Sequence, residues 1–175
     1  KNLTWSFDDC EDKPGQGVVS GFIAALKKHA VTRAIFFMTG DCYRGRPDLV
    51  SLIHSAGFEI GNHTKTHADL TKLSAAKIDA EIRGGPPGTR YFRPPYGASN
   101  ALVNSRIKAA GLINLIWSAS GGDSGLEGLT RSCDRILEDI VHTSDPGDAV
   151  LLHMYNPNSP AAMEAYLSGR PSCED

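Results

Sequence analysis

The chain has 175 residues, of which 41% are hydrophobic and 22% are charged, and its formal net charge is −2 at pH 7. This length suits a single domain with a substantial core, and the balanced charge offers no basic face that would favour a nucleic acid partner. The longest apolar runs, such as residues 149–152, are far too short to span a bilayer, so we expect no membrane span.

Strand-like and helix-like segments alternate along the sequence. Short apolar runs predict strands at residues 3–7, 34–38, 58–61, 91–93, 112–117 and 149–153. Apolar residues at helical spacing predict helices around residues 18–26, 49–53, 78–82, 102–107, 129–141 and 161–167. Strands that alternate with helices of this length indicate an α/β fold with a parallel sheet, open or closed into a barrel.

Polar residues gather at or just after the ends of the predicted strands. Because the carboxyl ends of parallel strands open on one face of such a sheet, we expect these side chains to converge in one cleft. The set comprises Asp8, Asp9, Asn62, His63, His67, Arg93, Asp123 and His153.

Two of these patterns suit a metal centre, although each is weak when read alone. Asp8 and Asp9 are neighbours in a strand and point to opposite sides, so one carboxylate can hold a metal while the other takes a proton from water. His63 and His67 are four residues apart, which would place both imidazoles on one face of a helix, at a spacing that suits metal ligation. The competing interpretations are a strand-end turn for the aspartates and structural or exposed roles for the histidines.

Two further patterns suit catalysis. The segment from Arg93 to Gly97 is stiffened by two prolines and could hold the Tyr96 backbone N–H at an oxyanion. His153 lies at the polar end of a buried strand and could act as a general acid. Read alone, the first segment is also simply a rigid loop, and His153 could equally be a core residue.

Taken together and in order, these segments resemble the NodB-homology polysaccharide deacetylases, carbohydrate esterase family 4. The resemblance runs from Thr4 to about Met154. The sequence departs from the fourth family motif, D-x-x-D-W. Asp123 matches the second Asp of this motif, but Ser120 stands in place of the first Asp and Ser124 in place of the Trp. The other four motifs read Ser6-Phe7-Asp8-Asp9-Cys10 for T-F-D-D-G, His63-Thr64-Lys65-Thr66-His67 for H-[ST]-x-x-H, Arg93-Pro94-Pro95-Tyr96-Gly97 for R-x-P-[FY]-G, and Leu151-Leu152-His153 for L-x-H.

The resemblance implies an incomplete, distorted (β/α) barrel in which residues 1–175 form a single catalytic domain. It implies that Asp9, His63 and His67 bind a divalent metal ion, usually zinc, with cobalt or another divalent ion as the alternative. One carboxylate and two neutral imidazoles are a suitable ligand set for a catalytic zinc site.

The resemblance also assigns the residues that move protons. Asp8 would take a proton from the attacking water, Arg93 would orient Asp8, and the Tyr96 N–H would stabilise the oxyanion. His153 would protonate the leaving group, and Asp123 would keep the imidazole charged near neutral pH. Contacts with the substrate are implied for Tyr96, Pro95, Leu151 and Trp117.

The implied function is hydrolytic removal of acetyl groups from an acetylated polysaccharide or oligosaccharide, such as N-acetylglucosamine units of chitin-type or peptidoglycan polymers, by a monomer. An acetylxylan esterase would use the same site, and a carbohydrate-binding pseudoenzyme is the rival from another class. Because Ser124 cannot offer the apolar wall of a Trp, we expect a wider pocket there, unless Tyr43 or Tyr155 fills the gap.

The four cysteines contain no CxxC pair, which argues against a zinc ribbon. Cys10 and Cys42 follow the first two strands, so we expect a Cys10–Cys42 disulfide, which leaves Cys133 and Cys173 as the second pair. Direct metal contact by Cys10 is the alternative. The even count, with the resemblance, indicates a secreted or cell-envelope protein. No signal-peptide pattern is visible, and the chain begins almost directly on a strand, which is compatible with removal of an upstream segment.

Overall fold

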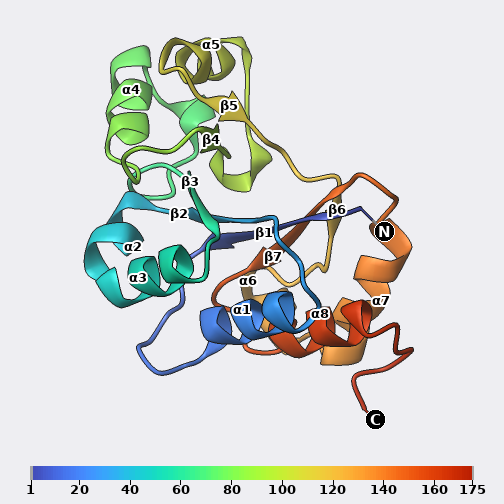
Figure 1. Ribbon diagram of the computed structural model, residues 1–175. Helices are drawn as coiled ribbons and strands as arrows, with labels where there is room; N and C mark the ends of the chain where they lie inside the picture. The colour runs from blue at the N-terminus through green and yellow to red at the C-terminus, as the bar shows by residue number, and fades with distance from the viewer. Residues whose placement is uncertain (1, 175) are drawn as a thin grey trace.

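Seven parallel strands form one sheet in the computed structural model, which describes residues 2–174 (Figure 1). The strand order across the sheet is β5-β4-β3-β2-β1-β7-β6. Within the described residues the edge strands β5 and β6 do not pair with each other, so the curled sheet is a half-barrel. This confirms the incomplete (β/α) barrel that we expected. The strands are β1 (Thr4–Asp9), β2 (Ala34–Met38), β3 (Glu59–Asn62), β4 (Tyr91–Phe92), β5 (Ile113–Asn114), β6 (Ala119–Ser120) and β7 (Ala149–His153).

Helices pack around this sheet in two groups (Figure 1). The helices α1, α7 and α8 lie together along the central strands, whereas α4 and α5 lie together beside β4 and β5. A large hydrophobic core lies under the first group and a smaller one under the second. The helices are α1 (Val18–Lys28), α2 (Gly40–Gly45), α3 (Pro47–Ser55), α4 (Ala75–Arg83), α5 (Ala101–Ala109), α6 (Gly125–Thr130), α7 (Cys133–Thr143) and α8 (Ser159–Leu167), with short 3-10 turns η1 (Leu70–Lys72) and η2 (Pro95–Gly97).

An aromatic stack at the centre of the sheet holds the end of β1 in place. Phe7 of β1 stacks on Phe36 of β2, with ring centroids 4.6 Å apart, and contacts Phe22 of α1 at 4.2 Å. All three rings are fully buried. Because side chains alternate along a strand, Phe7 enters this core while the next residue, Asp8, points to the other side of the sheet.

The predicted strand at residues 112–117 is wrong in its extent. Only Ile113–Asn114 pairs with β4, and residues 119–120 form a separate strand, β6, beside β7. The chain therefore crosses from one sheet edge to the other within five Cα steps, which span at most about 18 Å. The two edges must lie close together, and residues 115–118 bridge the opening of the half-barrel instead of continuing a strand.

The predicted helix at residues 129–141 is also wrong as a single element, because the chain breaks it into α6 and α7. Arg131 has an extended conformation, with φ −73° and ψ 130°. The Ser132 side chain then accepts a hydrogen bond from the Arg135 N–H at 3.1 Å and caps a new helix. Leu129 and Val141 are exposed, so they do not belong to one buried stripe.

Both predicted disulfides are confirmed. Cys10 bonds to Cys42, and Cys133 bonds to Cys173. The alternative of metal contact by Cys10 is wrong, because its sulfur is bonded to Cys42. Across residues 2–174, no helix has both the length and the apolar character that crossing a membrane requires.

Candidate active site

A pocket of about 430 Å³ opens at the carboxyl ends of β1 and β7, beside the loop that follows β3. Arg93 and Asp123 lie fully buried beneath the residues that line it. Pro95 is buried at the start of η2 and does not line the pocket, so its contribution is to stiffen the turn that carries Tyr96. The lining contains the predicted residues Asp8, Asp9, His63, His67, Tyr96, Trp117, Leu151 and His153, together with Ser124, Gly125 and Tyr155.

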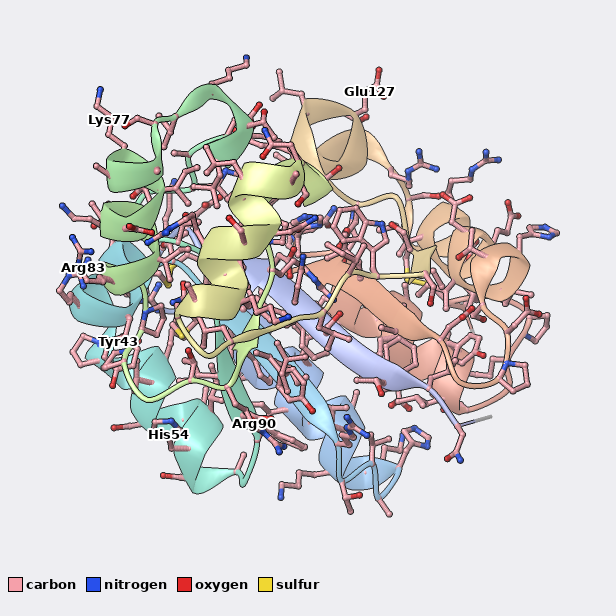
Figure 2. All side chains as sticks on the ribbon, turned by 90° about the horizontal axis from the view of Figure 1, so that it is seen from above. Tyr43, His54, Lys77, Arg83, Arg90 and Glu127 are labelled. Carbon is pink, nitrogen blue, oxygen red and sulfur yellow. A yellow bond between two sulfur atoms is a disulfide. The ribbon has the colours of Figure 1, made fainter. Side chains whose placement is uncertain are left out.

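A larger, open depression of about 750 Å³ lies at the other end of the strands, where β2, β3 and β4 begin. Tyr43, His54 and Arg90 line it, and Figure 2 shows them along one edge of the molecule. Tyr43 therefore cannot fill the gap left by Ser124. Of the two tyrosines considered for that gap, Tyr155 is the one in the pocket of predicted site residues.

The candidate metal ligands meet at one carboxylate oxygen. Asp9 Oδ1 lies 3.1 Å from His63 Nε2 and 3.1 Å from His67 Nε2. One ligand atom from each residue lies within 4.8 Å of the others. Burial acts to raise the pKa of Asp9, whereas positive charge on the side of His63 and His67 lowers that pKa below its ordinary value, so the carboxylate is ionised when a cationic group faces it.

The hydrogen bonds around this cluster fit a bound cation. His63 Nδ1 lies 2.6 Å from the Arg93 carbonyl oxygen, which can only accept, so Nδ1 carries the hydrogen and Nε2 presents a lone pair to Asp9. Asp9 Oδ1 is buried and accepts no hydrogen bond. A lone pair 3.1 Å from a carboxylate oxygen is repulsive unless a positive charge lies between them, so the donor set suits a divalent metal.

The two histidines do not come together through a helix. Residues 63–67 form a loop, in which Thr64 and His67 both have φ 68°. The Asn62 side chain accepts the Thr64 N–H at 2.9 Å and donates to the Ile82 carbonyl at 2.9 Å. Thr64 Oγ1 in turn accepts the His67 N–H at 3.0 Å. The imidazole centroids, 5.0 Å apart, are therefore set by loop hydrogen bonds.

Backbone strain is concentrated around the pocket. Among the described residues other than glycine, five have positive φ, and four of them belong to the site. Such conformations are costly, above all for a β-branched residue like Thr64, and persist where the surrounding structure enforces them. The four are Asp9 (φ 78°), Thr64 (φ 68°), His67 (φ 68°) and Tyr96 (φ 64°).

Asp8 is held by a buried arginine. Arg93 Nη1 donates to Asp8 Oδ1 at 2.8 Å and to Ser6 Oγ at 2.9 Å, and Arg93 Nε donates to the Leu115 carbonyl at 2.9 Å. The guanidinium also lies over the Phe37 ring at 4.3 Å. Asp8 Oδ2 remains on the metal side, 3.7 Å from His63 Nε2. Ser6 is not among the predicted site residues, because nothing in the first motif indicates that the Ser6 side chain contacts the arginine.

His153 lies beside Asp8 on the neighbouring strand β7, and its side chain is paired with Asp123. His153 Nδ1 lies 2.8 Å from Asp123 Oδ1. Asp123 Oδ2 accepts hydrogen bonds from the backbone N–H of His153 at 2.9 Å and from the Ser159 hydroxyl at 2.5 Å. Burial alone would lower the pKa of His153, but the Asp123 carboxylate raises it above its ordinary value. With Nδ1 donating to Asp123, Nε2 is left for the pocket.

The turn at Tyr96 is packed against Trp117. Tyr96 is 68% exposed, and its ring meets His67 edge-on at a centroid distance of 4.8 Å. A Cβ on Gly97, which has φ 64°, would lie 2.7 Å from the Trp117 ring. Only glycine combines this φ with this close approach, so Gly97 lets the turn sit directly on Trp117 at the pocket wall.

Comparison with known proteins decides the family. Residues 1–115 match the family described as polysaccharide deacetylase. The chain belongs to the polysaccharide deacetylase family. A family 4 carbohydrate esterase from Streptomyces lividans, solved in complex with acetate, shares 30% identity and a TM-score of 0.80, and the match covers 95% of this chain and 86% of that one.

Two curated relatives of this polysaccharide deacetylase family member are deacetylases. One is a chitooligosaccharide deacetylase from Rhizobium leguminosarum bv. trifolii, 32% identical over 87% of this chain and 71% of its own length. The other is the peptidoglycan-N-acetylmuramic acid deacetylase PdaA from Bacillus subtilis, 28% identical over 94% of this chain. The chain spans 64% of the length of PdaA.

Proposed function

We propose that the chain is a metal-dependent deacetylase of an acetylated polysaccharide, with N-acetylglucosamine units of a chitin-type or peptidoglycan polymer as its substrate. The observation that supports this best is that three kinds of group meet at one pocket. They are the three candidate metal ligands, the buried Asp8 carboxylate, and the His153 imidazole that pairs with Asp123. We further propose that residues 1–175 act as a single catalytic domain, as a monomer, outside the cytoplasm, where two disulfides persist.

Asp9, His63 and His67 would hold the metal, with zinc as the expected ion and cobalt as an alternative. Bound there, a divalent ion would lower the pKa of water towards about 7 and polarise the acetyl carbonyl. The chain contributes the fixed orientation of these ligands, through the His63 contact with the Arg93 carbonyl and through the strained backbone of Asp9 and His67.

The remaining residues move protons and stabilise charge. Asp8 Oδ2 takes a proton from the attacking water, while Arg93 holds the other carboxylate oxygen. The Tyr96 N–H, fixed by its left-handed turn, donates to the oxyanion that develops at the carbonyl. His153 Nε2 gives a proton to the leaving nitrogen, with Asp123 stabilising the imidazolium. Leu151 and Trp117 line the pocket around the acetylated unit.

The test is acetate release by the purified protein from acetylated chitooligosaccharides, peptidoglycan and acetylxylan, before and after removal of metal by a chelator. We expect hydrolysis of the N-acetylated substrates, loss of activity on chelation, and recovery with Zn²⁺ or Co²⁺. Faster release from acetylxylan would favour the esterase. Binding of these glycans without any acetate release, in metal-loaded protein, would identify a carbohydrate-binding pseudoenzyme and overturn the proposal.

The two disulfides should differ in their effect on metal binding. Cys10 follows Asp9 directly, and the first amides of α2, which carries Cys42, donate to the Thr64 and Lys65 carbonyls at 2.8 Å and 3.1 Å. Cys133–Cys173 lies away from these contacts. Because the pairs are separated by similar lengths, 32 and 40 residues, removing either should destabilise the fold by a similar amount, about 2–4 kcal/mol.

We therefore expect Cys10→Ser/Cys42→Ser to lower zinc affinity about tenfold or more, whereas Cys133→Ser/Cys173→Ser lowers thermal stability alone. Competition with a chromogenic chelator measures the affinity, and calorimetric unfolding measures the stability. Equal zinc affinity in the two double variants would show that the first disulfide does not support the ligands.

A further inference from the structure

Tyr155, which takes no part in the proposed proton transfers, completes the pocket on the His153 side. It lies in the turn that follows β7, two residues after His153, and lines the same pocket as that residue. The two rings are 5.1 Å apart between centroids and tilted by 37°. Tyr155 lies outside the five family motifs.

The Tyr155 ring is fixed at both ends. Its face lies against His153, and its hydroxyl accepts the Gly125 N–H at 2.9 Å, where α6 begins. Burial raises the pKa of Tyr155 to about 12, further above neutral pH than its ordinary value, so the hydroxyl carries no charge in the pocket. A side chain held in this way presents its ring to a ligand with little loss of conformational freedom.

The space beside Tyr155 is open. Ser124, which stands where the family motif has a Trp, is exposed, and a Cβ built on Gly125 would meet no atom within 4 Å. The other aromatic rings of the pocket lie on its metal side, where Tyr96 meets His67 and Trp117 packs under Gly97. Within the described lining, Tyr155 is therefore the aromatic wall next to the proton donor.

We propose that Tyr155 is a substrate-binding residue that packs against the sugar ring on the leaving-group side and replaces the aromatic wall lost at Ser124. This rests on the proposed function, because the proton from His153 goes to the leaving nitrogen, and that nitrogen is attached to the sugar. A group in ring contact with His153 therefore lies beside the sugar and away from the acetyl methyl. The apolar C–H face of a pyranose matches the face of an aromatic ring.

Tyr155→Ala, with the fold intact by calorimetric unfolding, is expected to weaken binding of an acetylated chitooligosaccharide and raise its KM about tenfold to a hundredfold. The loss in kcat/KM on this substrate should exceed the loss on 4-nitrophenyl acetate, which has no sugar, by at least about tenfold. Tyr155→Phe keeps the ring and should retain oligosaccharide affinity within about threefold. Ser124→Trp combined with Tyr155→Ala should recover part of the affinity.

Equal losses on the sugar substrate and on 4-nitrophenyl acetate would overturn the proposal, because Tyr155 would then act through His153, and the pH profile would shift as well. An unchanged KM and affinity in Tyr155→Ala would overturn it directly. If the wild-type protein binds the oligosaccharide by titration calorimetry without releasing acetate, the proposed reaction fails, and binding by Tyr155→Ala still decides the role of Tyr155. Wild-type protein that binds no acetylated oligosaccharide would overturn both proposals.

Discussion

Asp8→Asn should lower kcat for acetate release by about 10²- to 10⁴-fold while zinc stays bound, because an amide cannot take the proton of the attacking water. The asparagine side chain has nearly the same size as the aspartate, and Arg93 can still donate to its remaining oxygen, as it does to Asp8 Oδ1 at 2.8 Å. Asp9→Asn should instead lose the zinc, because Asp9 Oδ1 is the oxygen that both imidazoles face. Steady-state kinetics and metal content by mass spectrometry on dialysed protein measure the two effects.

The two variants are each other's control, since they make the same chemical change one residue apart. His63→Ala should behave as Asp9→Asn does, with low zinc content and no activity, because it removes another of the three ligands. Zinc-free Asp8→Asn together with zinc-loaded Asp9→Asn would reverse the two roles.

The opposite roles of Asp8 and Asp9 could be anticipated from the sequence, but the metal geometry could not. The expected alternation does not hold at Asp9, whose left-handed backbone (φ 78°) turns its carboxylate into the same pocket as Asp8. The two roles still separate, because Arg93 holds Asp8 while both histidines face Asp9. The spacing of His63 and His67 suggested a helix, yet a loop with two left-handed residues brings the rings together. No local preference predicts such a loop, because Asn62, anchored on α4, enforces it.

Long-range packing also explains the errors in the last third of the chain. The apolar run at residues 112–117 is typical of a strand, but the sheet has two edges to connect at this point. Leu115 therefore ends its pairing with Phe92, and Ser118 starts a new one with Ala149. The same crossing brings Trp117 under Gly97 and the Leu115 carbonyl to Arg93. The strand was predicted too long because these residues connect the two sheet edges and also contact the residues of the pocket.

Asp123→Asn should move the alkaline limb of the pH–kcat profile to lower pH. His153 must be protonated to serve as the acid, so activity falls as the pH rises through its pKa. In the folded protein burial acts to lower this pKa, but Asp123 raises it above the ordinary 6.5. Without the carboxylate charge the burial effect dominates, and the pKa drops.

The loss of activity in Asp123→Asn should therefore be larger at pH 8 than at pH 6. His153→Ala has no acid at any pH, so its kcat should be about 10²- to 10⁴-fold lower across the whole pH range. Asp79→Asn is the control, because Asp79 is likewise paired with a basic side chain, Arg106 at 2.7 Å, but lies on α4, outside the pocket. It should leave the profile in place. An alkaline limb that stays where it is in Asp123→Asn would mean that His153 is not the group whose protonation the reaction requires, and the proton for the leaving nitrogen would have to come from another residue.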